Sequence, residues 1–339
     1  MSVIEKGPRQ TPPIYKLNSS DDGSVFKDFI ALPQNDILIL GARRTPPIPC
    51  PAANTNTTIS ILTSVGFRVL SNVDYIAAVS RLRPDITIGL SDVVYPITEE
   101  RSLKRIDRMG ERSLKWTQEF VAANSNSGSD QATSFFAPVL PVDVNLQQEY
   151  LDGLAESGTI EKVSGLAILS VSTVPDLPEA FSHLPRLALT EPSTPSKLLQ
   201  EIFLGIDVFT IPFITSASDG GIALDFQFPV SSPSSAGSSP RPLGINLWNP
   251  QYTIDLKPLV EGCECYACKQ HHRAYLHHLF NAKEMLAWVL LQVHNHHVLD
   301  LFFAGVRRSI ADATFEDDVN QFNRYYESEL PEKTGQGPR

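Results

Sequence analysis

Residues 263–279 read Cys263-Glu-Cys265-Tyr-Ala-Cys268-Lys-Gln-His-His-Arg-Ala-Tyr-Leu-His-His-Leu279, and they hold three of the four cysteines in a chain of 339 residues. Cysteines with the spacing Cys-x-Cys-x-x-Cys are too close to form unstrained disulfides with one another, but their thiolates can converge on one tetrahedral metal ion. Zinc is the ion that such a thiolate cluster favours. The stretch therefore predicts a zinc site.

A disulfide framework is the alternative use of these cysteines. The chain opens with Met-Ser-Val-Ile-Glu-Lys-Gly-Pro-Arg, which lacks the apolar stretch of a secretion signal. The remaining cysteine, Cys50, lies far from the other three in the sequence. In a chain that we expect to be intracellular, the close spacing favours metal binding over disulfides.

The fourth ligand stays open on spacing alone. Seven of the eight histidines follow Cys268. His271 or His272 could complete the site directly after the last cysteine, as in compact zinc loops. The candidates are His271, His272, His277, His278, His294, His296 and His297.

Residues 262–310 resemble the zinc-binding segment of the tRNA-guanine transglycosylases, also called queuine tRNA-ribosyltransferases. The shared features are the cysteine cluster, the run Arg-Ala-Tyr-Leu-His-His-Leu at 273–279 and the pair His294-Asn295. The resemblance implies that the other histidines pack in the interior, cap helices or lie on the surface. It assigns one structural zinc ion to Cys263, Cys265, Cys268 and His294.

Short β-rich runs alternate with helical patterns through the middle of the chain, which predicts parallel βα units. A chain of this length with 42% hydrophobic residues can form one large α/β domain. We therefore expect an α/β fold of the TIM type, a (β/α)₈ barrel, with a zinc-binding subdomain inserted or appended. The predicted strands are 86–90, 135–140, 165–171, 186–190 and 207–213, and the predicted helices are 74–82, 106–121, 146–157 and 197–206.

The segments around this core differ in composition. The first 48 residues are too few for the first barrel elements of the family, so we expect either a truncated chain or a barrel that is incomplete at its N-terminus. The longest apolar stretch of the zinc segment, 285–291, is too short to cross a bilayer, and we expect a soluble protein. The expected segments are 1–48, partly disordered; 49–230, the barrel core; 231–242, a flexible loop rich in serine and proline; 243–330, the zinc-binding segment with C-terminal helices; and 331–339, a disordered tail.

A net charge of −10 argues against RNA binding by bulk electrostatics. Any contact with nucleic acid would need a local patch or a partner protein. Basic side chains from Arg101 to Lys115 recur at spacings of three and four, so they share one face of a predicted helix. A solvated helix surface is the more common use of this pattern, and contact with phosphate or with a partner is the alternative.

The resemblance also locates the catalytic positions. Catalytic members of the family form a covalent bond between a tRNA ribose and an aspartate, whose anionic carboxylate stabilises an oxocarbenium-like centre. The nucleophile's run, Gly-Val-Asp-Met-Phe-Asp, is matched here by Gly205-Ile-Asp207-Val-Phe-Thr210. Thr210 therefore stands at the nucleophile position, and its neutral hydroxyl needs a positioned base. Asp207 is a weak replacement, because side chains three positions apart on a strand point to opposite faces.

Other family motifs that bind the base are also absent, since 139–142 reads Val-Leu-Pro-Val where catalytic relatives have Val-Gln-Gly-Gly. This pattern resembles the family's non-catalytic accessory subunits, with no catalytic or cofactor-binding residues. The resemblance implies a heterodimer with a catalytic queuine tRNA-ribosyltransferase subunit, and tRNA contact through that complex, for exchange of guanine by queuine at the wobble position. It implies a cytoplasmic location, with peripheral attachment at the mitochondrial outer membrane as a second location. The alternatives are a zinc-stabilised tRNA-binding scaffold and an active transglycosylase with a rearranged nucleophile.

Overall fold

The computed structural model describes residues 13–17, 24–45, 47–97, 101–125, 133–156, 158–231 and 239–335. The chain divides into two compact units, one from Met1–Thr190 and Leu204–Thr210, the other from Glu191–Phe203 and Ile211–Arg339. Of the segments expected to be disordered or flexible, residues 1–12, 18–23, 46, 232–238 and 336–339 lie outside the described ranges. The domain boundaries expected from the sequence stay a prediction.

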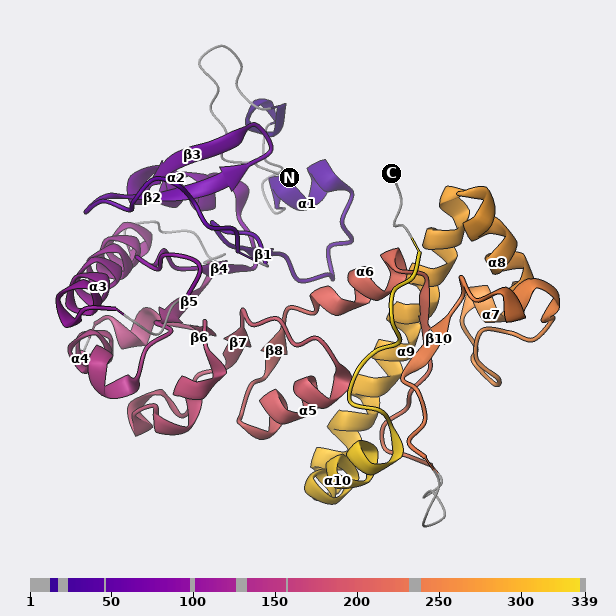
Figure 1. The fold of residues 1–339 in the computed structure, drawn as a ribbon. Coiled ribbons are helices and arrows are strands. Elements are labelled where there is room, and N and C mark those ends of the chain that lie inside the picture. Colours follow the sequence, from indigo (N-terminus) through magenta and orange to yellow (C-terminus); the bar gives the residue numbers. More distant parts are fainter. Residues whose placement is uncertain are drawn as a thin grey trace. The chain divides into compact units, whose positions relative to one another are not determined.

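A six-stranded parallel sheet forms the centre of the first unit (Figure 1), and its strand order is β1-β4-β5-β6-β7-β8. Each of the five predicted strands overlaps one of these strands. The run 207–213 is corrected at its end, because Pro212 begins helix α6, where a residue without an N–H is tolerated. The strands are β1 Ile39–Leu40, β4 Ile86–Ile88, β5 Ser134–Val139, β6 Gly165–Ile168, β7 Arg186–Ala188 and β8 Val208–Phe209.

The strand order distinguishes between the two common types of parallel α/β fold. A doubly wound sheet reverses its strand order at a switch point, whereas a barrel adds each new strand on the same side of the last one. Here β4 to β8 follow one another without reversal. The described residues therefore form an α/β fold with a barrel-like parallel sheet of six strands, and a closed barrel of eight strands is not seen among them.

Helices and one hairpin accompany this sheet in the first unit. Ser71 caps the N-terminus of α2 by accepting a hydrogen bond from Asp74 N, and Arg83 ends the helix in the left-handed region at φ 48°. The hydroxyl of the buried Tyr75 donates to the carbonyl of Ile88 at 2.7 Å, which ties α2 to β4. The elements are η1 Pro13–Lys16, α1 Val25–Ile30, the antiparallel pair β2 Thr58–Thr63 and β3 Gly66–Ser71, α2 Asn72–Leu82, α3 Leu103–Ser125, η2 Val144–Gln147, α4 Gln148–Ala155, η3 Ile160–Lys162, η4 Val171–Asp176 and η5 Glu179–Phe181.

Helices dominate the second unit, and α9 is its longest helix (Figure 1). Aromatic side chains from separate segments meet beside α9, where Phe302 lies 5.6 Å from Phe226 and 6.2 Å from Phe322 between ring centroids. None of the helices in the described ranges is long and apolar enough to cross a membrane. The elements are α5 Pro195–Phe203, α6 Pro212–Asp219, the antiparallel pair β9 Ile222–Leu224 and β10 Gly244–Asn246, η6 Pro250–Ile254, α7 Tyr266–Gln270, α8 Arg273–Ala282, α9 Met285–Ala311 and α10 Phe315–Tyr325.

Candidate metal centre

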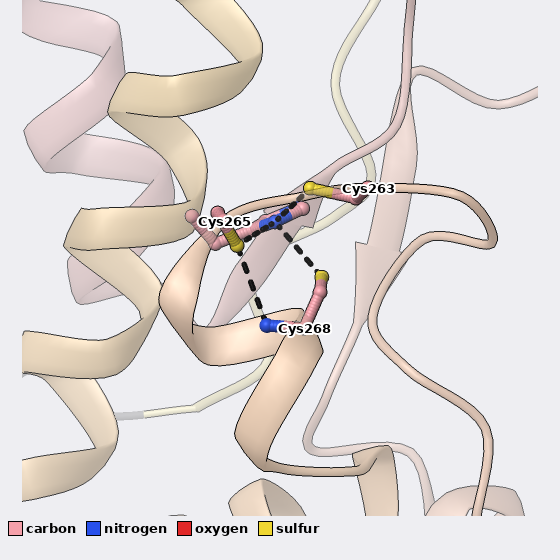
Figure 2. Close-up of side chains that lie close together, drawn as sticks. Cys263, Cys265 and Cys268 are labelled. Atoms are coloured by element: carbon pink, nitrogen blue, oxygen red, sulfur yellow. Dashed lines mark hydrogen bonds between the residues drawn. The ribbon is translucent and has the colours of Figure 1, made fainter.

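Three cysteines of the second unit meet where a loop enters α7. Gly262 adopts φ +76°, a conformation that L side chains rarely take, and this turn brings Cys263 back toward the helix. Cys265 is the N-cap of α7, and its sulfur accepts from the N–H of Cys268 at 3.3 Å. Figure 2 shows the three sulfur atoms pointing toward one another.

His294 completes the cluster from the middle of α9. Its Nδ1 atom lies 3.7 Å from the sulfur of Cys263, 3.5 Å from that of Cys265 and 3.4 Å from that of Cys268. All four candidate ligand atoms lie within 4.8 Å of one another. A tetrahedral zinc ion with ordinary Zn–S and Zn–N bond lengths separates sulfur from nitrogen by about 3.5 Å. The four side chains are therefore close enough together to hold a metal ion and are compatible with zinc.

The second ring nitrogen of His294 has a fixed partner. Nε2 lies 2.9 Å from the carbonyl oxygen of Leu224 in β9 and donates to it. This bond keeps a proton on Nε2, so Nδ1, which faces the sulfurs, is the nitrogen that can offer a lone pair to a metal ion. The histidine is thus held in the tautomer and orientation that a metal ligand needs.

The electrostatics of the cluster favour the thiolate form of Cys265. Burial raises the pKa of the Cys265 thiol, but hydrogen bonds from His294 and from the N–H of Cys268 outweigh burial and lower this pKa to about 6. Burial raises the pKa of Cys268. Burial lowers the pKa of His294, and the three cysteines more than offset it, raising that pKa to about 12. Because zinc binds thiolate and neutral imidazole, a zinc ion would take the place of the proton that Nδ1 otherwise holds among the sulfurs.

The histidines that spacing alone left open lie elsewhere. His272 caps α8 by accepting from the N–H of Tyr275 at 3.1 Å, and His271 stacks on the ring of Tyr275 at 5.0 Å between centroids. The buried His277 donates through Nδ1 to the carbonyl of Leu247 at 2.7 Å. Capping and packing, the roles that the family resemblance implied for these residues, are what the structure shows.

Asn295 has a role that the sequence alone did not reveal. Its side-chain oxygen accepts from Leu224 N at 2.9 Å, and its amide donates to Ile222 O at 2.9 Å and to Ser218 Oγ at 2.8 Å. The side chain is completely buried. His294 and Asn295 together thus bind both polar backbone groups of Leu224, so the candidate metal centre is fastened to β9.

Replacing Asn295 by alanine should lower the free energy of unfolding by about 3 kcal/mol or more, because several buried backbone and hydroxyl groups would lose their partner. Urea unfolding monitored by circular dichroism measures this change. The control is Asn323→Ala, which truncates an exposed asparagine of α10 and should cost less than about 0.5 kcal/mol. Equal effects of the two substitutions would contradict this role of Asn295.

The residues at the family's catalytic positions lie at opposite ends of β8. Asp207 precedes the strand, and its carboxylate accepts from the backbone N–H of Arg186 at 2.8 Å. Thr210 follows the strand, and its hydroxyl lies 3.3 Å from Ala188 O and 3.4 Å from Thr190 O. Neither arrangement supplies a carboxylate where a sugar could be attacked.

A cavity of about 180 Å³ lies at the carboxyl ends of the parallel strands, the edge at which barrels place their active sites. Thr210 lines this cavity and Asp207 does not. None of the described residues that line it carries a carboxylate. The cavity is lined by Ile39, Gly41, Ala42, Arg43, Arg44, Thr45, Pro47, Ile88, Gly89, Leu90, Ser91, Tyr95, Pro138, Leu169, Leu189 and Thr210.

Part of the basic face on α3 is turned inward. Arg105 donates to both carboxylate oxygens of Asp92, at 2.8 and 2.9 Å, and Arg112 donates to one of them at 2.9 Å. Asp92 is completely buried, and Asn54 donates to it at 2.8 Å. The expectation of a solvated face is therefore wrong for these two arginines, whereas Lys104, Arg108 and Lys115 are exposed. The sequence pattern gave no sign that Arg105 and Arg112 share Asp92 as a buried partner.

Comparison with known proteins gives a consistent result. Residues 17–328 match the family described as "Queuine tRNA-ribosyltransferase". A protein of Schizosaccharomyces pombe named "Queuine tRNA-ribosyltransferase accessory subunit 2" is 35% identical over 320 residues, which cover 94% of this chain and 71% of that protein. The human protein of the same name is 28% identical, over 83% of this chain and 76% of its own length. A Culex quinquefasciatus protein of that name is 25% identical, over 89% of this chain and 73% of its own length.

Proposed function

This chain belongs to the queuine tRNA-ribosyltransferase family, and from that premise we propose that it is a non-catalytic accessory subunit. It pairs with a catalytic subunit of the same family and supports exchange of guanine by queuine at the wobble position of tRNA. The curated relatives that match most of the chain carry the name of an accessory subunit. tRNA contact comes through the complex, which agrees with a net charge of −10 on this chain.

The cavity at the strand ends is the observation that carries the non-catalytic part of the proposal. Exchange through a glycosyl-enzyme bond needs a carboxylate nucleophile and an acid or base near it. The cavity has no carboxylate among its described lining residues, and Thr210 occupies the nucleophile position. The hydroxyl of Thr210 faces two backbone carbonyls, and these are not groups that accept its proton in catalysis.

We propose that Cys263, Cys265, Cys268 and His294 hold one structural zinc ion. Four protein ligands leave no position at which zinc could activate a water molecule. The spacing of the ligand atoms and the bond from His294 to Leu224 support this assignment. When bound, the ion supplies a cross-link between the loop before α7 and the middle of α9.

The fold part of the proposal is a TIM-type (β/α)₈ barrel that is incomplete at its N-terminus. Six parallel strands in sequential order support it. We propose a cytoplasmic location, with peripheral attachment at the mitochondrial outer membrane through the complex. Cell fractionation with antibodies against both subunits tests the location.

Co-expression with a catalytic family member tests the proposal. Size-exclusion chromatography should show a complex with one copy of each chain. Labelled guanine should be incorporated into tRNA only by samples that contain the catalytic chain. This chain alone should give no label, because its cavity lacks a nucleophile. Label incorporated by this chain alone would establish the rearranged transglycosylase instead. Recovery of tRNA without any paralogue would establish the scaffold.

A further inference from the structure

The cavity at the strand ends carries positive charge that the proposed function does not explain. Six of its lining residues carry polar side chains, and two of these are arginines that no carboxylate in the described lining neutralises. The rest of the lining is mostly aliphatic, with residues such as Ile88 in β4 and Leu189 directly after β7. The polar residues are Arg43, Arg44, Thr45, Ser91, Tyr95 and Thr210.

Arg43 is held in a fixed position at this cavity. Its two terminal nitrogens donate to the carbonyls of Ser91 at 3.2 Å and Val93 at 3.1 Å, and its guanidinium carbon lies 5.7 Å from the ring centroid of Tyr95. A guanidinium has five N–H groups, so these two bonds leave donors for a ligand. Burial lowers the pKa of Arg43 below its ordinary value. The arginine nevertheless remains charged at neutral pH, and its charge is poorly hydrated.

Arg44 contributes a second, unengaged cation. It is exposed and lines the same cavity, and it forms no hydrogen bond or ion pair within the described part of the chain. Asp92, the carboxylate whose charge acts on Arg43, is also bound by Arg105 and Arg112 from α3. The described surroundings therefore hold more positive than negative charge, although the whole chain is acidic.

We propose that this cavity binds the phosphomonoester group of a small metabolite. Guanidinium groups match phosphate oxygens with paired hydrogen bonds, and the hydroxyls of Thr45 and Ser91, which line the same cavity, can donate to the same oxygens. The aliphatic wall suits the uncharged part of the ligand. The volume of about 180 Å³ is below the ~300–1,000 Å³ of common ligand pockets, which favours a compact ligand such as a sugar phosphate. This inference goes beyond the proposed function and can fail while subunit pairing holds.

Calorimetric titration of the full chain with ribose 5-phosphate, and with ribose as the neutral match, tests the inference. Ribose 5-phosphate should bind at least about tenfold more tightly than ribose, because hydrogen bonds between charged groups are the stronger ones. Inorganic phosphate should compete with it, and added salt should weaken binding. Equal binding of the two sugars, or binding of neither, would overturn the inference. Binding of an RNA oligonucleotide without any binding of ribose 5-phosphate would also overturn it.

Variants locate the site. Arg44→Gln should weaken the binding of ribose 5-phosphate about tenfold. Because Arg44 has no described partner, the fold should be kept, and a thermal melt checks this. Arg108→Gln, which removes an exposed arginine of α3 outside the cavity lining, is the matched control and should leave binding unchanged. Ser91→Ala, which removes one hydroxyl from the cavity lining, is a second test and should weaken binding severalfold. Unchanged affinity in both cavity variants would place any binding elsewhere and refute the site.

Discussion

Replacing Cys268 by alanine should abolish zinc binding and unfold the second unit. Structural zinc sites have apparent binding free energies of about 10–16 kcal/mol, as large as the ~5–15 kcal/mol by which whole domains are stable. The cysteine is buried in the hydrophobic cluster that also holds Leu276, Phe280 and Leu291. Loss of the ion would therefore remove the link between α7 and α9 and leave the remaining thiols in an apolar setting. Elemental analysis of zinc per chain and hydrogen exchange along 244–325 measure both effects.

Cys50→Ala is the matched control for this experiment. It makes the same chemical change at a half-buried cysteine of the first unit, outside the cluster. The control should keep one zinc ion per chain and should change the free energy of unfolding by less than about 1 kcal/mol. A Cys268→Ala protein that lacks zinc but keeps the protection pattern of the control would refute a structural role for the ion.

Replacing Asp92 by asparagine should destabilise the first unit by about 3–5 kcal/mol, the usual cost of removing one partner from a buried ion pair. The asparagine keeps the size of the side chain but removes the charge that Arg105 and Arg112 share. The side chains of these two arginines are only 27% and 15% exposed, so water cannot replace the lost partner fully. Their mutual repulsion would then be unopposed. Urea unfolding of the variant and the parent chain gives the difference.

Lys115→Ala is the control for this prediction, because Lys115 lies on the same helix but does not contact Asp92. Lys115 forms an exposed pair with Glu119 at 3.9 Å, and such surface pairs contribute at most about 1 kcal/mol. If Asp92→Asn cost no more than this control, the buried cluster would not be a source of stability. A larger effect at high salt than at low salt would contradict the electrostatic cause.

The strands and the metal ligands could be predicted from the sequence for different reasons. Strands were predictable because a buried parallel strand is marked locally by a short β-rich run between helical patterns. The cysteines were predictable because their spacing within six residues is itself the constraint on metal geometry. The fourth ligand was not, since His271 and His272 satisfy the local spacing as well as any residue. Family resemblance, rather than geometry, pointed to His294.

The residues that bind the arginines of α3 could not be predicted from the sequence. A period of seven residues places Arg105 and Arg112 on one helix face, and the sequence showed this much. Whether that face meets water or a buried carboxylate depends on Asp92, which lies 13 and 20 residues away in a loop after β4. The polarity of the strand-end cavity depends in the same way on where the segment after β1 places Arg43 and Arg44.

By itself the sequence determined the class of fold, the thiolate cluster and the absence of an aspartate at position 210. Each of these follows from residues that are close together in the chain. Local spacing left open which histidine meets the cysteines. Apart from the family resemblance, only tertiary structure decides it, because Cys268 and His294 are 26 residues apart and the packing of α7 against α9 brings them together. Tertiary structure also decided that Asn295 binds β9 and that arginines line the cavity. These contacts join segments distant in sequence, and their geometry follows from packing that no local pattern encodes.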